Sequence, residues 1–397
     1  WNLYRLRDGV SEPVSPMDAD MADPPWELGQ FNYGFLSEGH AIIRAEHPEG
    51  DQLYRLDLDS GSLTPAPSPL ATVDCIGASG GKIVFTGTPD DETAMLLELD
   101  SSGSEYRVLH HPQPHELDKR FISTAQAMEF PTNDGRTAHG YWIPPQNPYY
   151  RPLDGEKPPV IVCAHGGPTW RFHRAFTACF NFWTSRGVGV FTVNYGGSSG
   201  YGREFRERLD GEYGVVDVND TLAAARHLAA TGLADPNRIA VRGSSAGGYI
   251  VLGCLAWGDE FSAGIDYFGL SDVGAWVRDT HKHELHMLDR LLAPYPGNEE
   301  LYAERSPVNY VDQIEAPLLV LQGKEDKVVP PNQSEFIVEG MNRRGMPVAY
   351  LTFEDEYHGF SKPETNIRAA QAELYFLGKV FGFDPADTIE PLDILNM

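Results

Sequence analysis

The sequence Ile239-Ala-Val-Arg-Gly-Ser-Ser-Ala-Gly-Gly-Tyr-Ile250 starts as a short apolar run, turns sharply, and continues into an apolar stretch that ends near Trp257. This order of strand, Gly-x-Ser-x-Gly turn and helix is the setting of a nucleophile elbow. Gly243 and Gly247 suit a turn that is too tight for a side chain, and the pattern predicts Ser245 at its apex. Glycine and serine are common in loops, so the rest of the chain decides what the motif means.

Strands and helices alternate around this turn from residue 160 onward. Continuous apolar runs rich in Val, Ile and Leu predict strands that are buried on both faces. The predicted strands are Val160–Ala164, Gly189–Asn194, Arg238–Arg242, Gly264–Phe268, Pro317–Gln322 and Val348–Phe353, and the predicted helices are Asp217–Ala230, Ala246–Trp257, Gln333–Arg344 and Asn366–Phe381. A hairpin over 127–143, with a tight turn at Asn133-Asp134-Gly135, precedes them. The pattern predicts a doubly wound α/β domain with a mainly parallel sheet over residues 119–397.

Residues 1–118 instead show short strands separated by turn residues, with an internal echo. The sequence Leu3-Tyr-Arg-Leu6 recurs as Leu53-Tyr-Arg-Leu56, and Leu56-Asp-Leu-Asp-Ser-Gly61 recurs loosely as Leu97-Glu-Leu-Asp-Ser-Ser-Gly103. Offsets of about 40 to 50 residues are typical of β-propeller blades, so we expect part of a propeller, about two to two and a half blades. A small β-sandwich is the alternative. Closed propellers have about four or more blades, so the remaining blades and the native N-terminus are expected outside this chain.

Composition restricts the classes of partner. The 397 residues are 41% hydrophobic and 22% charged, as in a soluble globular protein, and carry a net charge of -26. This charge argues against a nucleic-acid partner, which needs a basic stripe, and no apolar run is long enough to predict a membrane partner. The cysteines (Cys75, Cys163, Cys179 and Cys254) lie far apart, which favours free thiols and a cytoplasmic location.

Three predicted strands are followed by reactive side chains. Ser245, Asp326 and His358 each follow the carboxyl end of a strand, where open α/β sheets form their sites, and they occur in the order found in α/β-hydrolases. A serine hydroxyl needs a base, so His358 is predicted to take its proton and Asp326 to orient the imidazole. Glu325 beside Asp326, and Glu354 or Asp355 near His358, are alternative acids.

The segment His165-Gly-Gly-Pro168 predicts an oxyanion hole because it follows the first parallel strand. We assign the donors to the backbone N–H groups of Gly167 and Ala246, and interpret His165 as structural. The glycine-rich run 194–202 lacks the lysine of a phosphate-binding loop, so it is interpreted as a loop that shapes the site. The histidines of His281-Lys-His-Glu-Leu-His286 have no recognised metal spacing, and no metal is predicted. Asp217 and Asp220 are interpreted as capping and anchoring a helix.

Residues 119–390 resemble the catalytic domain of the prolyl oligopeptidase family, in particular its acylaminoacyl-peptidase and dipeptidyl-peptidase-like branch. The matching motifs are His165-Gly-Gly-Pro168, Asn194-Tyr-Gly-Gly-Ser-Ser-Gly-Tyr-Gly202, Gly243-Ser-Ser-Ala-Gly-Gly248, Gln322-Gly-Lys-Glu-Asp326 and Tyr357-His-Gly-Phe360. The resemblance implies a serine peptidase whose propeller covers the active site, with Ser245, Asp326 and His358 as its triad. Relatives often carry an arginine or asparagine two residues after the acid, where this chain has Val328. Arg278 and Arg290 are candidate replacements.

The sequence therefore predicts a serine peptidase that hydrolyses short peptides through an acyl-enzyme on Ser245, without a cofactor. Tyr249, Phe268 and Trp276 are predicted to line the substrate pockets. A carboxylesterase with the same triad is the alternative, and a non-catalytic propeller interaction protein is a third hypothesis. The choice between exopeptidase and endopeptidase is left open. A separate chain that carries the remaining blades and a second copy of this chain are the candidate protein partners.

Overall fold

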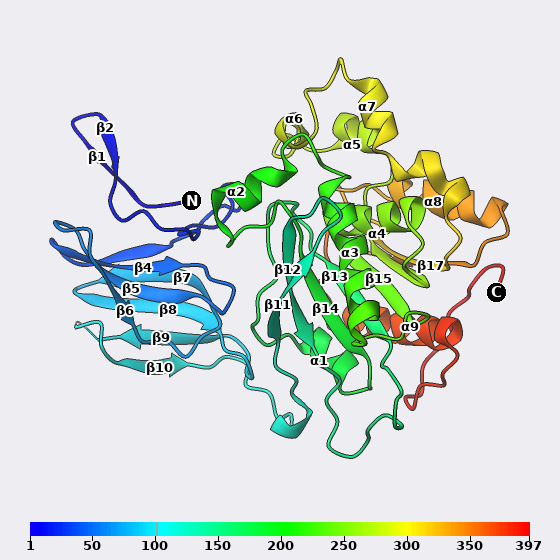
Figure 1. Cartoon of the computed structure of the whole chain (residues 1–397), viewed down its shortest axis with the longest axis horizontal. Coiled ribbons are helices and arrows are strands. Elements are labelled where there is room, and N and C mark those ends of the chain that lie inside the picture. The colour runs from blue at the N-terminus through cyan, green and yellow to red at the C-terminus, as the bar shows by residue number, and fades with distance from the viewer. Residues whose placement is uncertain (101) are drawn as a thin grey trace.

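A computed structural model describes residues 1–100 and 102–397, and Figure 1 shows a β part (blue and cyan) beside an α/β part (green to red). The α/β part is built on one sheet of eight strands in the order β11-β12-β14-β13-β15-β16-β17-β18. Its strands are β11 (Gln126–Pro131), β12 (Thr137–Ile143), β13 (Val160–Ala164), β14 (Gly189–Asn194), β15 (Ile239–Ser244), β16 (Ala263–Tyr267), β17 (Leu318–Gly323) and β18 (Val348–Phe353). The pairs from β14 to β18 are parallel, whereas β11 and β12 pair antiparallel. The predicted mainly parallel α/β sheet is thus confirmed.

Three predicted carboxyl ends of strands were wrong by one or two residues, and two of them have a clear local reason. β15 continues past Arg242 because Ser244 still pairs with Tyr267 of β16. β16 stops at Tyr267 because Phe268 has a φ of +43°, which cannot continue a strand.

Helices cover both faces of this sheet. The helical segments are η1 (Lys119–Phe121), α1 (Ala178–Thr184), α2 (Gly202–Arg206), η2 (Glu207–Leu209), α3 (Val216–Thr231), α4 (Ala246–Trp257), α5 (Val273–Asp279), α6 (Leu288–Leu291), α7 (Glu299–Glu304), η3 (Pro307–Gln313), α8 (Asn332–Arg343) and α9 (Pro363–Phe381). Side chains of α3, α4 and α8 share one core with Val160 and Val162, while α1 and α9 share the opposite core with Ile161 and Cys163. Burial on both faces explains why the strand sequences are continuously apolar. The helix predicted to start at Asn366 begins earlier, at Pro363, because proline is well suited to a first helical turn.

The β part contains two antiparallel four-stranded sheets and one hairpin. The hairpin is β1 (Tyr4–Arg7) and β2 (Val10–Pro13), the first sheet is β3 (Tyr33–Ser37), β4 (His40–Ala45), β5 (Gln52–Asp57) and β6 (Leu63–Ala66), and the second is β7 (Thr72–Ser79), β8 (Lys82–Thr88), β9 (Met95–Leu99) and β10 (Tyr106–His110). The two sheets share an apolar core that includes Ile42, Leu53, Val73, Ile83 and Leu97. The first Leu-Tyr-Arg-Leu sequence runs into β1, which pairs with β2, and the second lies in β5, which pairs with β4 and β6.

A buried ionic cluster joins the two parts. The guanidinium of Arg171 lies 2.5 Å from Asp51 and 3.2 Å from Glu46, which also binds Arg44 at 2.9 Å. All four side chains are buried. Burial opposes the charge on Asp51, but the guanidinium groups of Arg171 and Arg44 outweigh it, so the pKa of Asp51 falls below its ordinary value. Because Arg171 lies three residues after Pro168, the cluster fixes the loop that carries the His-Gly-Gly-Pro segment to the β part.

Further polar contacts extend this junction. Arg174 binds both carboxylate oxygens of Asp90, at 2.9 and 2.5 Å, and donates to the carbonyl of Glu49 at 2.7 Å. The buried carboxylate of Asp20 accepts from the backbone N–H of Gly200 at 2.9 Å. The loops of the β part therefore contact two different loops of the α/β part.

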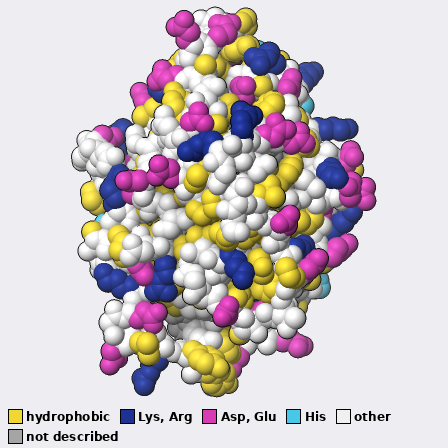
Figure 2. All heavy atoms as spheres, turned by 90° about the vertical axis from the view of Figure 1, so that its right-hand side faces the viewer, with side chains coloured by type: hydrophobic (Ala, Val, Ile, Leu, Met, Phe, Trp, Pro, Cys, Tyr) yellow, Lys and Arg dark blue, Asp and Glu magenta, His cyan; other side chains and the backbone are white. Residues whose placement is uncertain are grey.

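The surface of the α/β part carries charges of both signs. Figure 2 shows acidic and basic side chains interspersed over the face that lies to the right in Figure 1. Among the helices of the described residues, none combines the length and apolar character needed to cross a membrane.

We expect Arg171→Ala to destabilise the protein much more than Arg136→Ala. Removal of Arg171 leaves the buried carboxylate of Asp51 without its ion-pair partner and leaves Glu46 with Arg44 alone, which costs about 3–5 kcal/mol in the free energy of unfolding. Arg136 pairs with Asp134 at the surface, so its removal should cost about 0–1 kcal/mol. Urea unfolding of both variants, followed by circular dichroism, measures the difference. Equal shifts of the two midpoints would contradict a stabilising role of the cluster.

Candidate active site

The turn between β15 and α4 holds Ser245 in a strained backbone conformation. Ser245 has φ 56° and ψ -121°, a region that residues with side chains rarely adopt. A Cβ atom on Gly243 would lie 2.2 Å from the carbonyl oxygen of Gly247, and one on Gly247 would lie 2.3 Å from that of Ala164. Only glycine fits at these two positions, as the sequence predicted. The N–H of Ser245 donates to the carbonyl of Tyr267 at 2.9 Å, which fixes the apex to β16.

The three side chains predicted as a triad lie in hydrogen-bond contact. Oγ of Ser245 is 2.8 Å from Nε2 of His358, and Nδ1 of His358 is 2.8 Å from Oδ2 of Asp326. A carboxylate accepts hydrogen bonds, so Nδ1 is the donating nitrogen and Nε2 is free to accept from the hydroxyl. This arrangement can remove the proton of Ser245 as the oxygen attacks a carbonyl carbon.

The loop after β17 holds Asp326 from behind. Its Oδ1 accepts from the backbone N–H groups of Val328 and Val329, both at 2.9 Å, while Oδ2 faces His358. The indole N–H of Trp276 donates to the carbonyl of Val328 at 2.7 Å, which holds the same loop. The carboxylate therefore has little freedom to rotate away from the imidazole.

The alternative acids are engaged elsewhere. Glu354 forms an exposed ion pair with Lys324, and Asp355 pairs with Lys362 at 3.4 Å. Glu325 is exposed, unlike Asp326. The structure thus brings Asp326, rather than its neighbours, to His358.

A residue that the sequence did not single out supports His358. The buried carboxylate of Glu356 accepts from the backbone N–H groups of Ser361 and Lys362, both at 3.0 Å, and so closes the loop that carries His358. The ring of Phe268 lies 4.8 Å from the imidazole. Within Glu354-Asp-Glu356, the sequence gave no signal that only the third carboxylate would turn inward.

The His-Gly-Gly-Pro segment lies directly against the elbow. A Cβ atom on Gly166 would be 2.9 Å from the carbonyl oxygen of Ser244 and 3.5 Å from Cβ of Ser245. The amide of Asn194 binds the backbone of Phe172 twice, at 2.7 and 3.1 Å, and so fixes the far end of this loop. Ala246 is the first residue of α4, where backbone N–H groups lack helical partners. The role of the Gly167 and Ala246 N–H groups as oxyanion donors remains a prediction.

His165 belongs to the framework of this loop. Its Nδ1 donates to the carbonyl of Gly166 at 3.0 Å, its Nε2 lies 2.7 Å from the hydroxyl of Ser198, and its ring stacks on Tyr195 at 4.2 Å. Burial lowers the pKa of His165 to about 4, so the ring is neutral at pH 7.

Comparison with known proteins identifies the family. The sequence profile described as the Prolyl oligopeptidase family matches residues 174–384, more than half of the chain. The chain belongs to the prolyl oligopeptidase family. The α/β part is accordingly an α/β-hydrolase domain, as predicted.

Individual relatives are similar over most of this chain. Dipeptidyl peptidase family member 6 of Caenorhabditis elegans is 29% identical over 70% of this chain and 42% of its own length. Dipeptidyl aminopeptidase BIII of Pseudoxanthomonas mexicana is 28% identical over 79% of this chain and 48% of its own length. The structure of a Mycobacterium tuberculosis puromycin-hydrolyzing peptidase superimposes with a TM-score of 0.95 at 38% identity, over 100% of this chain and 60% of that one. The chain thus spans about half the length of these curated relatives of the prolyl oligopeptidase family.

Two predicted pocket residues are placed in the core instead. Tyr249 is fully buried, stacks on Tyr213 at 4.6 Å and donates its hydroxyl to the carbonyl of Arg305 at 2.9 Å. Trp276 is also buried and holds the acid loop, as described above. Neither side chain reaches a surface that a substrate could contact, so these two predictions were wrong. Phe268 lies beside His358, and its role as a pocket residue stays a prediction.

The two arginines considered as substrate anchors bind other groups. Arg278 donates to the hydroxyl of Tyr295 at 2.9 Å, and Arg290 binds the carboxylate of Asp210 at 2.7 Å. The substrate anchor of this member of the prolyl oligopeptidase family is therefore not identified by these positions.

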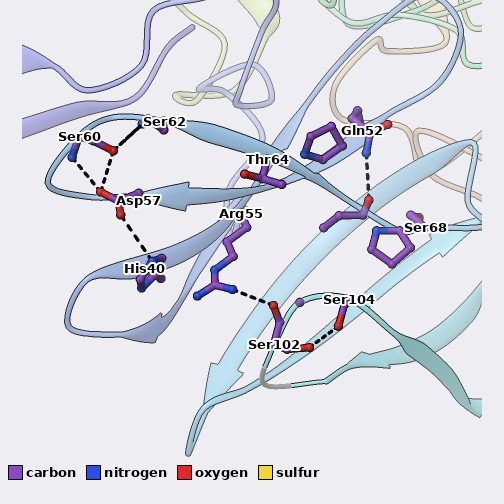
Figure 3. Close-up of a pocket in the computed structure, with 14 residues that line it drawn as sticks. His40, Gln52, Arg55, Asp57, Ser60, Ser62, Thr64, Ser68, Ser102 and Ser104 are labelled. Carbon is purple, nitrogen blue, oxygen red and sulfur yellow. Dashed lines mark hydrogen bonds and ion pairs between the residues drawn. The ribbon is translucent and has the colours of Figure 1, made fainter.

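Other polar groups lie away from the triad. A cavity of about 870 Å³ lies in the β part, between β5, β6 and the turn at 102–104. Figure 3 shows that its polar side chains largely bind one another, as Ser60 binds Asp57. The searched residues, 1–100 and 102–397, contain no group of three His, Cys, Asp or Glu side chains that could hold a metal ion. His286 instead lies 2.9 Å from Asp289.

A buried carboxyl group lies behind the elbow. Asp266 of β16 is fully buried, and a Cβ atom on Gly248 of α4 would be 2.2 Å from its Oδ1. Burial raises the pKa of Asp266 to about 7, although the backbone N–H of Gly269 acts in the opposite direction. Asp266 is the one charged residue inside the otherwise uncharged run Ala263–Tyr267, and this contrast is the signal in the sequence that marks it.

We expect the free energy of unfolding to decrease as the pH rises from 5 to 7, and we expect Asp266→Asn to make this decrease smaller. In this window the folded state keeps the proton of Asp266 while the unfolded chain has lost it, so the free energy of unfolding falls by about 1.4 kcal/mol per pH unit. Asparagine does not titrate and removes this contribution. Burial also raises the pKa of Asp217 to about 7, so part of the pH-dependent decrease in the free energy of unfolding should remain in this variant. Urea unfolding at pH 5 and at pH 7 measures this pH dependence, and Asp259→Asn, at an exposed position, is the control. The same pH dependence in Asp266→Asn and wild type would contradict the assignment.

We expect Asp326→Asn to lower kcat by about ten-thousand-fold, because an amide favours the wrong imidazole tautomer. Glu325→Gln removes a neighbouring exposed carboxylate and should change kcat little. The rates of both variants on a nitrophenyl ester, compared with wild type, measure this difference. A large loss of kcat in Glu325→Gln with a small loss in Asp326→Asn would show that Glu325, rather than Asp326, is the acid.

Proposed function

We propose that this chain is a serine peptidase that hydrolyses short peptides through an acyl-enzyme on Ser245. The observation that carries the proposal is the unbroken hydrogen-bond chain from Oγ of Ser245 through His358 to Asp326, with both contacts at 2.8 Å. Membership of the prolyl oligopeptidase family supports the same chemistry.

The reaction follows from these contacts. Oγ of Ser245 attacks the carbonyl carbon of the scissile bond while Nε2 of His358 takes its proton. The negative oxygen that forms would be held by the N–H groups of Gly167 and Ala246, each donor worth about 3 kcal/mol in the transition state. His358 then gives the proton to the leaving amine, which departs and leaves an acyl group on Ser245. A water molecule, activated by the same imidazole, releases the acyl group and restores the hydroxyl.

The choice of peptides over other acyl compounds rests on the relatives. Dipeptidyl aminopeptidase BIII is named for release of dipeptides, and the Mycobacterium tuberculosis structure is named for hydrolysis of puromycin. Both names describe peptidases, which are enzymes that cleave amide bonds. We infer the same class of bond for this chain, and a carboxylesterase remains the alternative.

We also propose that the two four-stranded sheets and the β1–β2 hairpin are two blades and the outer half of a third in a β-propeller. The remaining blades, in this protein or in a separate chain, are the partner that this arrangement requires. Tyr33 and Phe35 support the proposal because they are exposed although their cross-strand neighbours Ile43 and Ala41 are buried. The apolar face of this sheet therefore continues onto the exposed side of β3, where a further sheet could pack.

Location and assembly are further proposals. We propose a cytoplasmic location, for which the free thiols of Cys163 and Cys254 in the core give support. We propose that this chain, in the absence of the remaining blades, self-associates through the exposed aromatic side chains of β3. Light scattering of wild type and Phe35→Ser tests this: a wild-type monomer would overturn it.

Three substrates with a common alanyl group distinguish the candidate activities. We expect wild type to cleave an alanine anilide with a free amine, a blocked alanine anilide, or both, and Ser245→Ala to cleave neither. The ratio of the two rates separates release of free from blocked N-terminal residues, and puromycin serves as a further amide. Cleavage of the matched nitrophenyl ester without any amide would overturn the peptidase proposal in favour of an esterase.

A further inference from the structure

Trp26 of the β part lies against the loop that is predicted to stabilise the oxyanion. A Cβ atom on Gly167 would be 2.5 Å from both Cζ2 and Cη2 of the Trp26 indole, so the ring occupies the space beside this glycine. The indole N–H donates to the hydroxyl oxygen of Thr169 at 2.9 Å. One side chain from the β part therefore contacts the loop at two positions, on either side of Pro168.

The segment that carries Trp26 is itself anchored. The carbonyl of Trp26 lies 3.2 Å from Nε2 of His283, and the neighbouring Asp23 binds the buried Arg44 at 2.7 Å. Arg44 belongs to the ionic cluster described above. The indole is thus held by both parts of the protein, while 38% of its surface stays exposed.

The two contacts of Trp26 restrict movement of this loop. Gly167 has a φ of +50°, and the N–H of Trp170 donates to its carbonyl at 2.6 Å, which makes 167–170 a tight turn. Rotation of the Gly167 peptide toward the β part is blocked by the indole. Thr169 accepts a hydrogen bond from the same ring, so movement of the turn away from the β part would break this bond.

We propose that Trp26 is a positioning residue that clamps the oxyanion loop, so that the β part supplies a component of catalysis as well as a cover. The proposal rests on the proposed hydrolytic function of Ser245. Trp26 acts through Gly167, whose N–H binds the oxygen most strongly in the transition state. Its loss must therefore reduce kcat and leave KM nearly unchanged.

The test compares Trp26→Ala with Phe31→Ala, which removes an exposed aromatic ring from the same segment. We expect Trp26→Ala to lower kcat on the nitrophenyl ester by about tenfold to a hundredfold, less than removal of the donor itself. KM should stay within about twofold. The inhibition constant of a peptide aldehyde, which forms a tetrahedral adduct on Ser245, should rise by the same factor as kcat falls. Phe31→Ala should match wild type in all three quantities.

Two conservative variants separate packing from hydrogen bonding. Trp26→Phe keeps a ring beside Gly167 but loses the N–H, and Thr169→Val loses the acceptor. Both variants should lower kcat by the same small factor. If Trp26→Ala does not fold, these two variants replace it in the test. Wild-type kcat in all three variants overturns the proposal. A raised KM at unchanged kcat also overturns it, because Trp26 would then contact the substrate instead.

The rate at which a fluorophosphonate probe labels Ser245 provides a readout that needs no substrate. We expect this rate to fall in Trp26→Ala and to be unchanged in Phe31→Ala. If wild type is labelled but cleaves no peptide, the proposed peptidase function fails while the clamp is still judged by the labelling rates. Equal labelling of wild type and Trp26→Ala overturns the clamp alone.

Discussion

The charge of Arg171 is the constraint on which the arrangement of the two parts depends. A guanidinium group cannot stay in a protein interior without partners, and both of its carboxylate partners, Glu46 and Asp51, come from the β part. The docking of the β part is therefore a condition for burying the loop that follows β13. The same loop carries Gly167 and lies against Ser245. One ionic cluster thus connects the packing of the two parts with the geometry of the catalytic residues.

The catalytic residues themselves are positioned by backbone contacts. Ser245 is held by the fit of two glycines and by one hydrogen bond to β16, Asp326 by two N–H groups of its own loop, and His358 by the closure of its loop around Glu356. Each support is local to its strand end. Ser245, Asp326 and His358 lie in contact because the parallel sheet brings these three strand ends to one edge.

This distinction explains what the sequence could predict. Apolar runs identify the strands because both faces of the sheet are buried, and strand ends identify Ser245, Asp326 and His358 because the sheet gathers them. Nearness in sequence was a poor guide to the pockets. Tyr249 follows Ser245 closely, but the helix turns its ring toward Tyr213, and the indole of Trp276 is drawn inward because its N–H finds a carbonyl. The contact between Trp26 and Thr169 spans 143 positions, and no local pattern encodes it.

The order of these elements along the chain has a consequence for biosynthesis. Domains fold as they leave the ribosome, beginning with the N-terminal part. Asp51 is made 120 positions before Arg171, and His358 comes 113 positions after Ser245. The acidic partners of the junction are therefore present before the loop that needs them, and the base arrives last. The three predicted triad residues are therefore complete only after the acidic residues that bind Arg171 have been synthesised.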